Sequence, residues 1–142
     1  MLVNTYGVQQ LLNVTSDTSI QIDLQSNSTA WTVLQAILPL YSGATITTGN
    51  ADIQISTDHH NKSADYIIEN DLSNINNRRP KKIYVIPEAT AVLGIGNDPN
   101  FLTSYNLKDN RLTINGPSVM MGYLDNAENN RVFTENSLIL KI

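Results

Sequence analysis

The acidic residue that is best placed for chemistry is Glu88. It follows the expected strand at residues 81–86 and Pro87, which halts that strand. Ligand sites in α/β proteins gather at the ends of strands. A Mg²⁺ ion there takes one or two carboxylates together with phosphate oxygens. Glu88 is therefore a candidate metal ligand beside a phosphate-bearing substrate, and an ordinary surface carboxylate is the alternative interpretation.

Other residue types that could support catalysis or metal binding give weaker patterns. His59 and His60 stand beside Asp58, but adjacent side chains diverge and no third ligand lies at a useful offset, so a solvated loop is favoured over a metal site. Gly94-Ile95-Gly96 lacks the third glycine of a dinucleotide fingerprint. The absence of cysteine excludes disulfides, thiolate metal sites and cysteine nucleophiles.

Composition describes an acidic and weakly charged chain. Of its 142 residues 41% are hydrophobic and 15% are charged, and the net charge is −4. An acidic chain is a poor nucleic-acid binder, and the basic residues 78–82 are expected to form a solvated loop. No apolar run is long enough to span a membrane, and no secretory signal is visible. We expect one domain over residues 1–142, located in the cytoplasm.

The elements that must position these residues begin with a half-buried strand at residues 19–24, where apolar and polar side chains alternate. A buried helix is expected at 30–38, ending at Pro39. Residues 44–48 and 53–55 predict two strands around a Gly49-Asn50 turn. Residues 63–72 have apolar positions at helical spacing, and Ser63 is a suitable cap for that helix.

The second half of the chain predicts more strands than helices. After the strand at 81–86, a loop is expected around Gly94, Gly96 and Pro99. Further strands are expected at 111–115 and 138–142, with a short helix at 127–133 between them. The apolar residues 138–140 are expected to be exposed and to favour self-association or pairing with another chain. The fold class is α/β or α+β, a mixed sheet with a few flanking helices.

Residues 111–136 carry the most specific pattern of the chain. The positions that matter are Leu112, Ile114, Gly116, Pro117, Val119, Met120, Gly122, Tyr123, Leu124, Asn126, Glu128 and Phe133. This order resembles the acyl-adenylate-forming ligases, which include acyl-CoA synthetases and other AMP-binding enzymes. In that family Gly-Glu-Leu-x-Ile is followed by Gly-Pro-x-Val-Met-x-Gly-Tyr-Leu, Asn-Pro-Glu and a Phe. Residues 38–46 resemble the family's Pro-Leu-x-x-Gly-Ala turn, and the two blocks occur in the family's order.

A third correspondence lies at residues 84–88. The family has Tyr-Gly-x-Thr-Glu at a strand end, where Tyr stacks on adenine, Thr contacts phosphate and Glu binds Mg²⁺. Tyr84 and Glu88 fall on the matching positions, whereas Val85 replaces the Gly and Pro87 replaces the Thr. The resemblance therefore implies ATP and Mg²⁺ as cofactors, Tyr84 as the nucleotide-binding residue and Glu88 as the catalytic metal ligand.

The resemblance implies ATP-dependent activation of a carboxylic acid, with a nucleotide and a small carboxylic acid as ligands. The 142 residues do not contain the family's phosphate loop ending in Pro-Lys-Gly, its ribose-binding Thr-Gly-Asp or the C-terminal domain with the catalytic Lys. The expectation is a fragment or shortened relative of an AMP-dependent acyl-CoA synthetase that is inactive alone, so whether it is an enzyme is left open. A noncatalytic, β-rich binding or structural module is the alternative.

Overall fold

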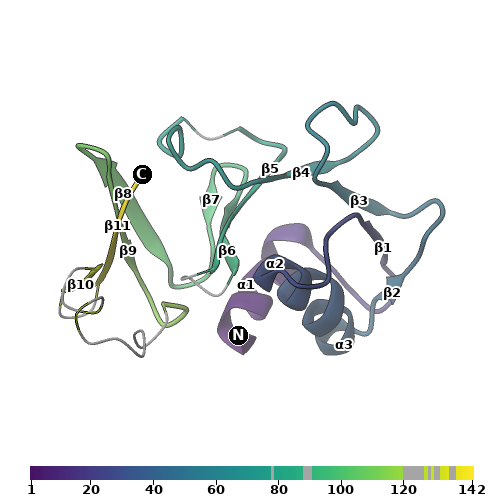
Figure 1. Ribbon diagram of the computed structural model, residues 1–142. Coiled ribbons are helices and arrows are strands. Elements are labelled where there is room, and N and C mark those ends of the chain that lie inside the picture. Colours follow the sequence, from purple (N-terminus) through teal and green to yellow (C-terminus); the bar gives the residue numbers. More distant parts are fainter. Residues whose placement is uncertain (78, 88–90, 120–126, 128, 130–131, 135–136) are drawn as a thin grey trace.

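A seven-stranded mixed sheet covered by helices forms the larger part of the molecule (Figure 1). The computed structural model describes residues 1–77, 79–87, 91–119, 127, 129, 132–134 and 137–142. The helical elements are α1 (Leu2–Leu12), α2 (Thr29–Trp31), the π-helical η1 (Thr32–Ile37) and α3 (Leu38–Ser42). The strands are β1 (Ser19–Ile22), β2 (Thr45–Ile46), β3 (Ile53–Ser56), β4 (Tyr66–Glu69), β5 (Lys82–Ile86), β6 (Ala91–Ile95), β7 (Asp98–Pro99), β8 (Ser104–Lys108), β9 (Arg111–Asn115), β10 (Phe133–Thr134) and β11 (Ser137–Lys141).

The large sheet contains both parallel and antiparallel pairs of strands. The order is β2-β1-β3-β4-β5-β6-β7, parallel from β2 to β5 and antiparallel from β5 to β7. A second, antiparallel sheet has the order β10-β11-β9-β8 and stands at the β6–β7 end of the molecule (Figure 1). The predicted mixed α/β fold is confirmed.

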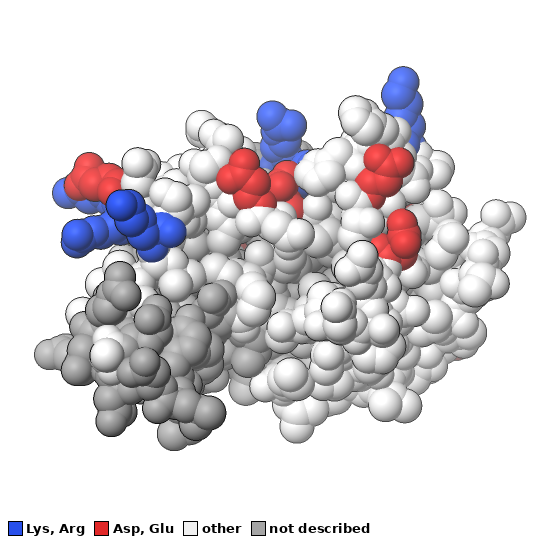
Figure 2. Space-filling model, viewed as in Figure 1, with Lys and Arg blue, Asp and Glu red and all other residues white. Residues whose placement is uncertain are grey.

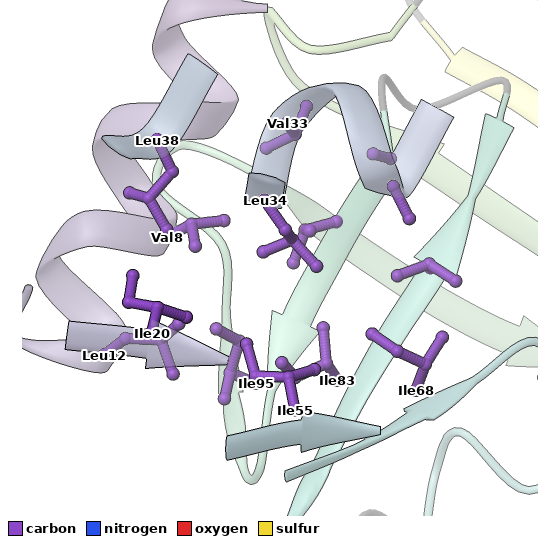
Figure 3. Close-up of a cluster of buried hydrophobic side chains, with 14 of the residues drawn as sticks. Val8, Leu12, Ile20, Val33, Leu34, Leu38, Ile55, Ile68, Ile83 and Ile95 are labelled. Carbon is purple, nitrogen blue, oxygen red and sulfur yellow. The ribbon is translucent and has the colours of Figure 1, made fainter. Parts of the chain in front are cut away.

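The helices and the large sheet enclose the main hydrophobic core (Figure 3). Val8, Val33, Leu34 and Leu38 from the helices meet Ile20 and other strand residues, and each of these five side chains is fully buried. A strand whose two faces are both buried has a continuous apolar sequence. Strand β6 is an example, since all its five residues are buried.

Two buried asparagines connect α1 to β6 by hydrogen bonds. The Asn4 side chain donates from Nδ2 to the Val92 carbonyl at 2.7 Å, and the Val92 N–H donates back to Asn4 Oδ1 at 3.3 Å. Asn100 Nδ2 donates to the carbonyls of Asn4 and Val92 at 3.1 and 3.0 Å. Because buried backbone groups need partners, these amides supply the polar contacts that the interface between a helix and a sheet would otherwise lack.

A second core lies between the two sheets. Tyr84 and Leu93 from the large sheet pack with Leu112, Ile114 and Leu138 from the small one. The expectation that residues 138–140 are exposed is wrong. Strand β11 pairs with β9 along its whole length, Leu138 is fully buried, and its two neighbours are partly buried.

The helical run extends beyond its expected end at Pro39. Proline is tolerated in the first turn of a helix, where its missing N–H has no partner to lose. Here Pro39 lies in the first turn of α3, directly after the π-helical segment η1, and the run continues to Ser42. Gly43 then ends it in a left-handed conformation, with φ of 77°.

The two strands expected around Gly49-Asn50 exist, but they do not form a hairpin. Strands β2 and β3 both run parallel to β1 and lie on opposite sides of it. The turn therefore carries the chain across β1. The alternation of apolar and polar residues identified the strands but contains no information on which strands are neighbours.

The helix expected at residues 63–72 is wrong, because the middle of this range is strand β4. Ile67 and Ile68 are both buried although adjacent residues of a strand point to opposite faces. A short apolar run that is buried on both faces gives the same pattern as a segment of a buried helix, and the parallel pairing of β4 with β3 and β5 decides between them.

Two further expectations are corrected in part. Gly94 lies inside strand β6, and only Gly96 lies in the turn that joins β6 to β7. Of the short helix expected at 127–133, Ala127, Asn129 and Val132 are helical, whereas Phe133 belongs to β10. The remaining residues of that range lie outside the described part of the chain.

A reciprocal contact between Ser19 and Asp52 joins the starts of β1 and β3. The Asp52 carboxylate accepts hydrogen bonds from Ser19 Oγ at 2.6 Å and Ser19 N at 2.8 Å. The side-chain bond from Ser19 lowers the pKa of Asp52 most, and the backbone bond adds to this. A carboxyl group with a lowered folded pKa stabilises the fold above its ordinary pKa of about 3.9, and that contribution is lost as the pH falls through the folded pKa.

We expect Asp52→Asn to unfold at lower urea concentration than the parent chain at pH 7, because the amide replaces a charge-assisted acceptor. The difference in midpoint should shrink below about pH 4, because the proton binds first to the unfolded chain and, as the pH falls further, to the native Asp52 carboxylate. Asp17→Asn is the control, since the Asp17 carboxylate accepts no hydrogen bond within the described residues. A gap between Asp52→Asn and the parent that is the same at pH 7 and pH 3 would contradict this assignment.

Candidate functional site

The carboxyl end of β5 faces the start of the helical run. Ser28 caps this run, with its Oγ accepting from Trp31 N at 3.0 Å. A small cavity of about 70 Å³ opens between the two elements. Its lining residues are Ser28, Thr29, Ala30, Asn70, Val85, Ile86, Pro87 and Ala91. Glu88, the predicted metal ligand, follows Pro87 directly and lies outside the described residues. The cavity places polar helix-cap groups beside the strand end that leads into Glu88.

The backbone on the far side of Glu88 is strained. Ala91 has φ of 94°, a left-handed value that residues with a side chain rarely adopt, and the residue is only 1% exposed. Strain of this kind persists only where the surrounding structure enforces it, and it gathers at functional sites. In the sequence, residues 88–90 thus follow a proline and precede a strained alanine.

Tyr84 is more enclosed than a nucleotide-stacking ring would be. The residue is 3% exposed and belongs to the core between the two sheets. Its hydroxyl accepts a hydrogen bond from Arg79 N at 2.8 Å. Tyr84 packs in the core between the two sheets and Val85 in the core under the helices, so their side chains point to opposite faces of the large sheet. The stacking role of Tyr84 stays a prediction, and it requires the connector around Arg79 to uncover the ring.

A charged cluster covers the sheet next to Tyr84. Lys82 Nζ lies 3.2 Å from Glu69 Oε2 and 3.1 Å from His59 Nδ1. Lysine can only donate, so His59 Nδ1 is the acceptor in this pair and the contact does not resemble a metal site. Among the described residues no group of three or more histidines or acidic residues could hold a metal ion. Lys82 and Glu69 therefore form a partly buried ion pair, and His59 is hydrogen-bonded to its lysine.

Charged residues of both signs alternate along one side of the face shown in Figure 2. The helical part of that face carries none, in keeping with the absence of any charged residue between positions 24 and 51. On this face the described residues thus form no continuous basic patch of the kind that nucleic-acid binding requires. Within the described residues, no helix is both long enough and apolar enough to cross a membrane.

The glycines of the two resembling blocks have structural roles. Gly43 ends α3, as described above. Gly116 follows β9 with φ of 139°, and a Cβ on it would lie 2.5 Å from the Leu102 carbonyl oxygen. The block that begins at Gly116 therefore shapes a tight backbone crossing, while its part from Met120 to Asn126 lies outside the described residues.

One cleft was not predicted from the sequence. It has a volume of about 370 Å³ and opens at the carboxyl ends of β1, β2 and β3. Its lining residues are Gln21, Ile22, Asp23, Gln35, Ile46, Thr47, Thr48, Gln54, Ile55, Ser56, Asn61 and Ala64. Alternation in the sequence shows that Gln21 and Gln54 are polar positions on strands, but only the strand order brings them side by side.

Comparison with known proteins confirms the resemblance at the level of the fold. No protein-family model matches the sequence, and no curated protein matches it. The fold is similar to that of wild-type MenE from E. coli with a bound m-phenylether-linked analogue of OSB-AMS, with a TM-score of 0.64 and 12% identity over 98% of this chain. It is also similar to a double mutant of o-succinylbenzoate CoA synthetase (MenE) from Bacillus subtilis bound with its product analogue OSB-NCoA, with a TM-score of 0.58 and 13% identity over 97% of this chain.

The match covers 40% and 41% of those two chains. This protein therefore has the fold of about two fifths of an o-succinylbenzoate CoA synthetase, which is an AMP-binding, adenylate-forming ligase.

Proposed function

We propose that this chain is a fragment or shortened relative of an AMP-dependent acyl-CoA or acyl-acid synthetase. The observation that carries the proposal is the match in fold over 98% of the chain. It is supported by the independent order of the two sequence blocks at residues 38–46 and 111–136. Similarity at 12% identity transfers the fold, so the substrate, cofactors and activity below are proposals.

The part of the site that we assign to this chain is the carboxyl end of β5. Glu88 would bind Mg²⁺, which neutralises phosphate charge when an ATP–Mg²⁺ complex is bound. Thr29, at the start of the helical run, lines the same cavity as Pro87 and would offer its hydroxyl group to a polar ligand, whereas the Ser28 hydroxyl already donates to the Gln25 carbonyl. Tyr84 would contact adenine once the connector around Arg79 moves away from its ring. The ligands would be a nucleotide and a small carboxylic acid, in the cytoplasm.

In the complete reaction a carboxylate oxygen attacks the α-phosphorus of ATP, the acyl–phosphate bond forms, and the bond to pyrophosphate breaks. Adenylation relies on donors that stabilise the transferring phosphate, and such motifs are missing from the 142 residues. We therefore propose that these 142 residues contribute a metal-binding corner and cannot complete the reaction by themselves.

The test is ATP–pyrophosphate exchange with radiolabelled pyrophosphate, Mg²⁺ and a panel of aliphatic and aromatic carboxylic acids. The expected result for the isolated chain is no exchange above the rate without protein. An intact acyl-CoA synthetase run in parallel shows that the assay works. Exchange that depends on both Mg²⁺ and an added acid, and that Glu88→Gln abolishes, would overturn the proposed inactivity and would show a complete adenylation site.

A further inference from the structure

An exposed apolar patch lies where α1 begins, beside the turn at residues 100–103 that leads from β7 to β8 (Figure 1). Its side chains are Leu2, Tyr6, Phe101 and Leu102, which are 64%, 37%, 44% and 65% exposed. Leu2 and Tyr6 are one helical turn apart on α1 and therefore neighbours on its surface. The rings of Tyr6 and Phe101 meet edge to face, with their centroids 5.0 Å apart. The patch therefore joins the helix to the turn.

The turn that carries Phe101 and Leu102 is held in place from the core. Thr103 N donates to the Asn100 carbonyl at 2.9 Å, which closes a four-residue turn. Asn100 is 1% exposed, and its side chain is hydrogen-bonded to α1 and to β6. The patch is therefore preorganised, and a preorganised surface loses less conformational entropy when it binds.

Leu102 occupies a backbone position that does not suit leucine. It is the third residue of the turn and has φ of 54°. Turns with a positive φ at this position usually have glycine or asparagine there, and a bulky residue in this conformation is an outlier. Its high exposure shows that internal packing does not compensate. A contact with another molecule would account for this leucine, whereas neither the backbone nor the core does.

The charge around the patch selects the partner. No charged side chain occurs in residues 1–16 or 99–107, although 15% of the whole chain is charged and its net charge is −4. Two copies of an acidic chain repel each other where their charged faces meet. A two-fold contact brings the same surface of both copies together, so an uncharged surface avoids like-charge pairs. A different protein would be recognised through complementary charges, and these segments offer none.

We propose that this patch is the contact surface of a homodimer, in which a second copy of the chain covers Leu2, Tyr6, Phe101 and Leu102. Aromatic residues are enriched and charged residues are depleted at the centre of such interfaces. Both copies contribute the same four side chains, whose removal from water drives the association. An interface of so few residues is weak, with a dissociation constant on the order of 10⁻⁵ M. The proposal does not depend on the adenylate chemistry.

The test is sedimentation velocity of the full 142-residue chain, from about tenfold below to about tenfold above that dissociation constant. We expect the average mass to rise from 15.7 kDa toward twice this value. Added NaCl should strengthen the dimer, because salt screens the repulsion between two acidic chains, and a dimer that salt weakens would contradict an uncharged contact. A chain that stays monomeric throughout would overturn the proposal. Binding of that monomer to phosphatidylcholine vesicles would assign the patch to a lipid surface instead.

The variant Leu2→Glu separates dimerisation from folding. Leu2 is the first residue of α1, whose first turn contains no acidic residue, and a carboxylate there is favourable to the helix dipole. The variant should therefore unfold at no lower urea concentration than the parent. Its dissociation constant should rise about tenfold or more, because a carboxylate enters the contact without a countercharge.

Ile142→Glu is the matched control, since it adds the same charge at another exposed apolar residue. The Ile142 N–H donates to the Asn110 carbonyl, just before β9 begins, whereas Leu102 lies against Gly116, just after β9 ends. Ile142 is therefore a strand's length away from the patch. Its substitution should leave the dissociation constant unchanged.

A second variant, Leu102→Asn, acts on the other element of the patch. Asparagine tolerates a positive φ in a turn, so the melting temperature of the dilute, monomeric protein should stay equal or rise. The loss of a large apolar side chain from the contact should raise the dissociation constant about tenfold. If Leu2→Glu and Leu102→Asn both dimerise as the parent does, the contact lies elsewhere and the proposal is wrong.

Discussion

Replacing Gly7 by alanine should destabilise this protein by about 3 kcal/mol or more, the upper part of the range for overpacking a filled site. Alanine normally stabilises a helix relative to glycine by roughly 1 kcal/mol. At position 7 of α1 we expect the opposite effect, a loss of stability. A Cβ on Gly7 would lie 1.7 Å from Asn100 Oδ1 and 2.7 Å from Phe101 N. The second contact is with backbone, so a rotation of the Asn100 side chain does not relieve it. Urea unfolding followed by circular dichroism measures the loss.

Gly49→Ala provides the matched control for this substitution. A Cβ at Gly49 meets only Thr47 Oγ1, at 3.8 Å, and its φ lies outside the left-handed region. Its free energy of unfolding should change by about 0.5 kcal/mol or less. If Gly7→Ala is as stable as Gly49→Ala, Gly7 of α1 does not pack closely against Asn100 and Phe101.

Asn4→Ala should cost about 3 kcal/mol of unfolding free energy. The substitution leaves the Val92 N–H without its partner inside the core and removes one of two donors to the Val92 carbonyl. Each buried group left without a partner costs roughly 1–3 kcal/mol, and Asn4 itself is fully buried. Hydrogen exchange should show the largest increase at the Val92 amide.

The exposed Asn27 is the control for Asn4, and Asn27→Ala should change stability by about 0.5 kcal/mol or less. Equal effects of the two substitutions would mean that the amide of Asn4 does not serve the α1–β6 interface. Because Asn4 and Asn100 both donate to the Val92 carbonyl, only the double substitution leaves that carbonyl without a donor, and it should cost more than the sum of the two single ones.

The sequence predicts those strands that have one buried face and one solvent-exposed face. Residues 19–22 and 111–115 alternate in this way, and both are strands within the predicted ranges. Helix α1 was not predicted. It has neither a side-chain cap at Met1 nor charged residues in its terminal turns, so the usual boundary signals are missing. Its stability comes from long-range contacts such as the Asn4–Val92 pair, which sequence spacing does not contain.

The candidate sites depend on strand order even more strongly. Glu88 was found because it follows a strand and matches a family position, and both are local properties. The cleft at the carboxyl ends of β1, β2 and β3 could be located only once β1 was known to lie between β2 and β3. The alternating segments predict on which face of a strand Gln21 and Gln54 lie, but they do not predict which strand is adjacent. The sequence shows Gln35 only as one polar position in a buried helix.

The proposal that the carboxyl end of β5 is the metal–nucleotide corner of an adenylate-forming fold is tested most directly by paramagnetic relaxation. Mn²⁺ takes the place of Mg²⁺, and weak binding suffices to broaden nearby NMR signals. With ATP present, the amide signals of Ser28, Thr29, Ala30 and Ala91 should broaden first, and Glu88→Gln should abolish the effect. Broadening that is centred on Asp52 and Asp65 at the opposite edge of the sheet, or that persists in Glu88→Gln, would contradict the account.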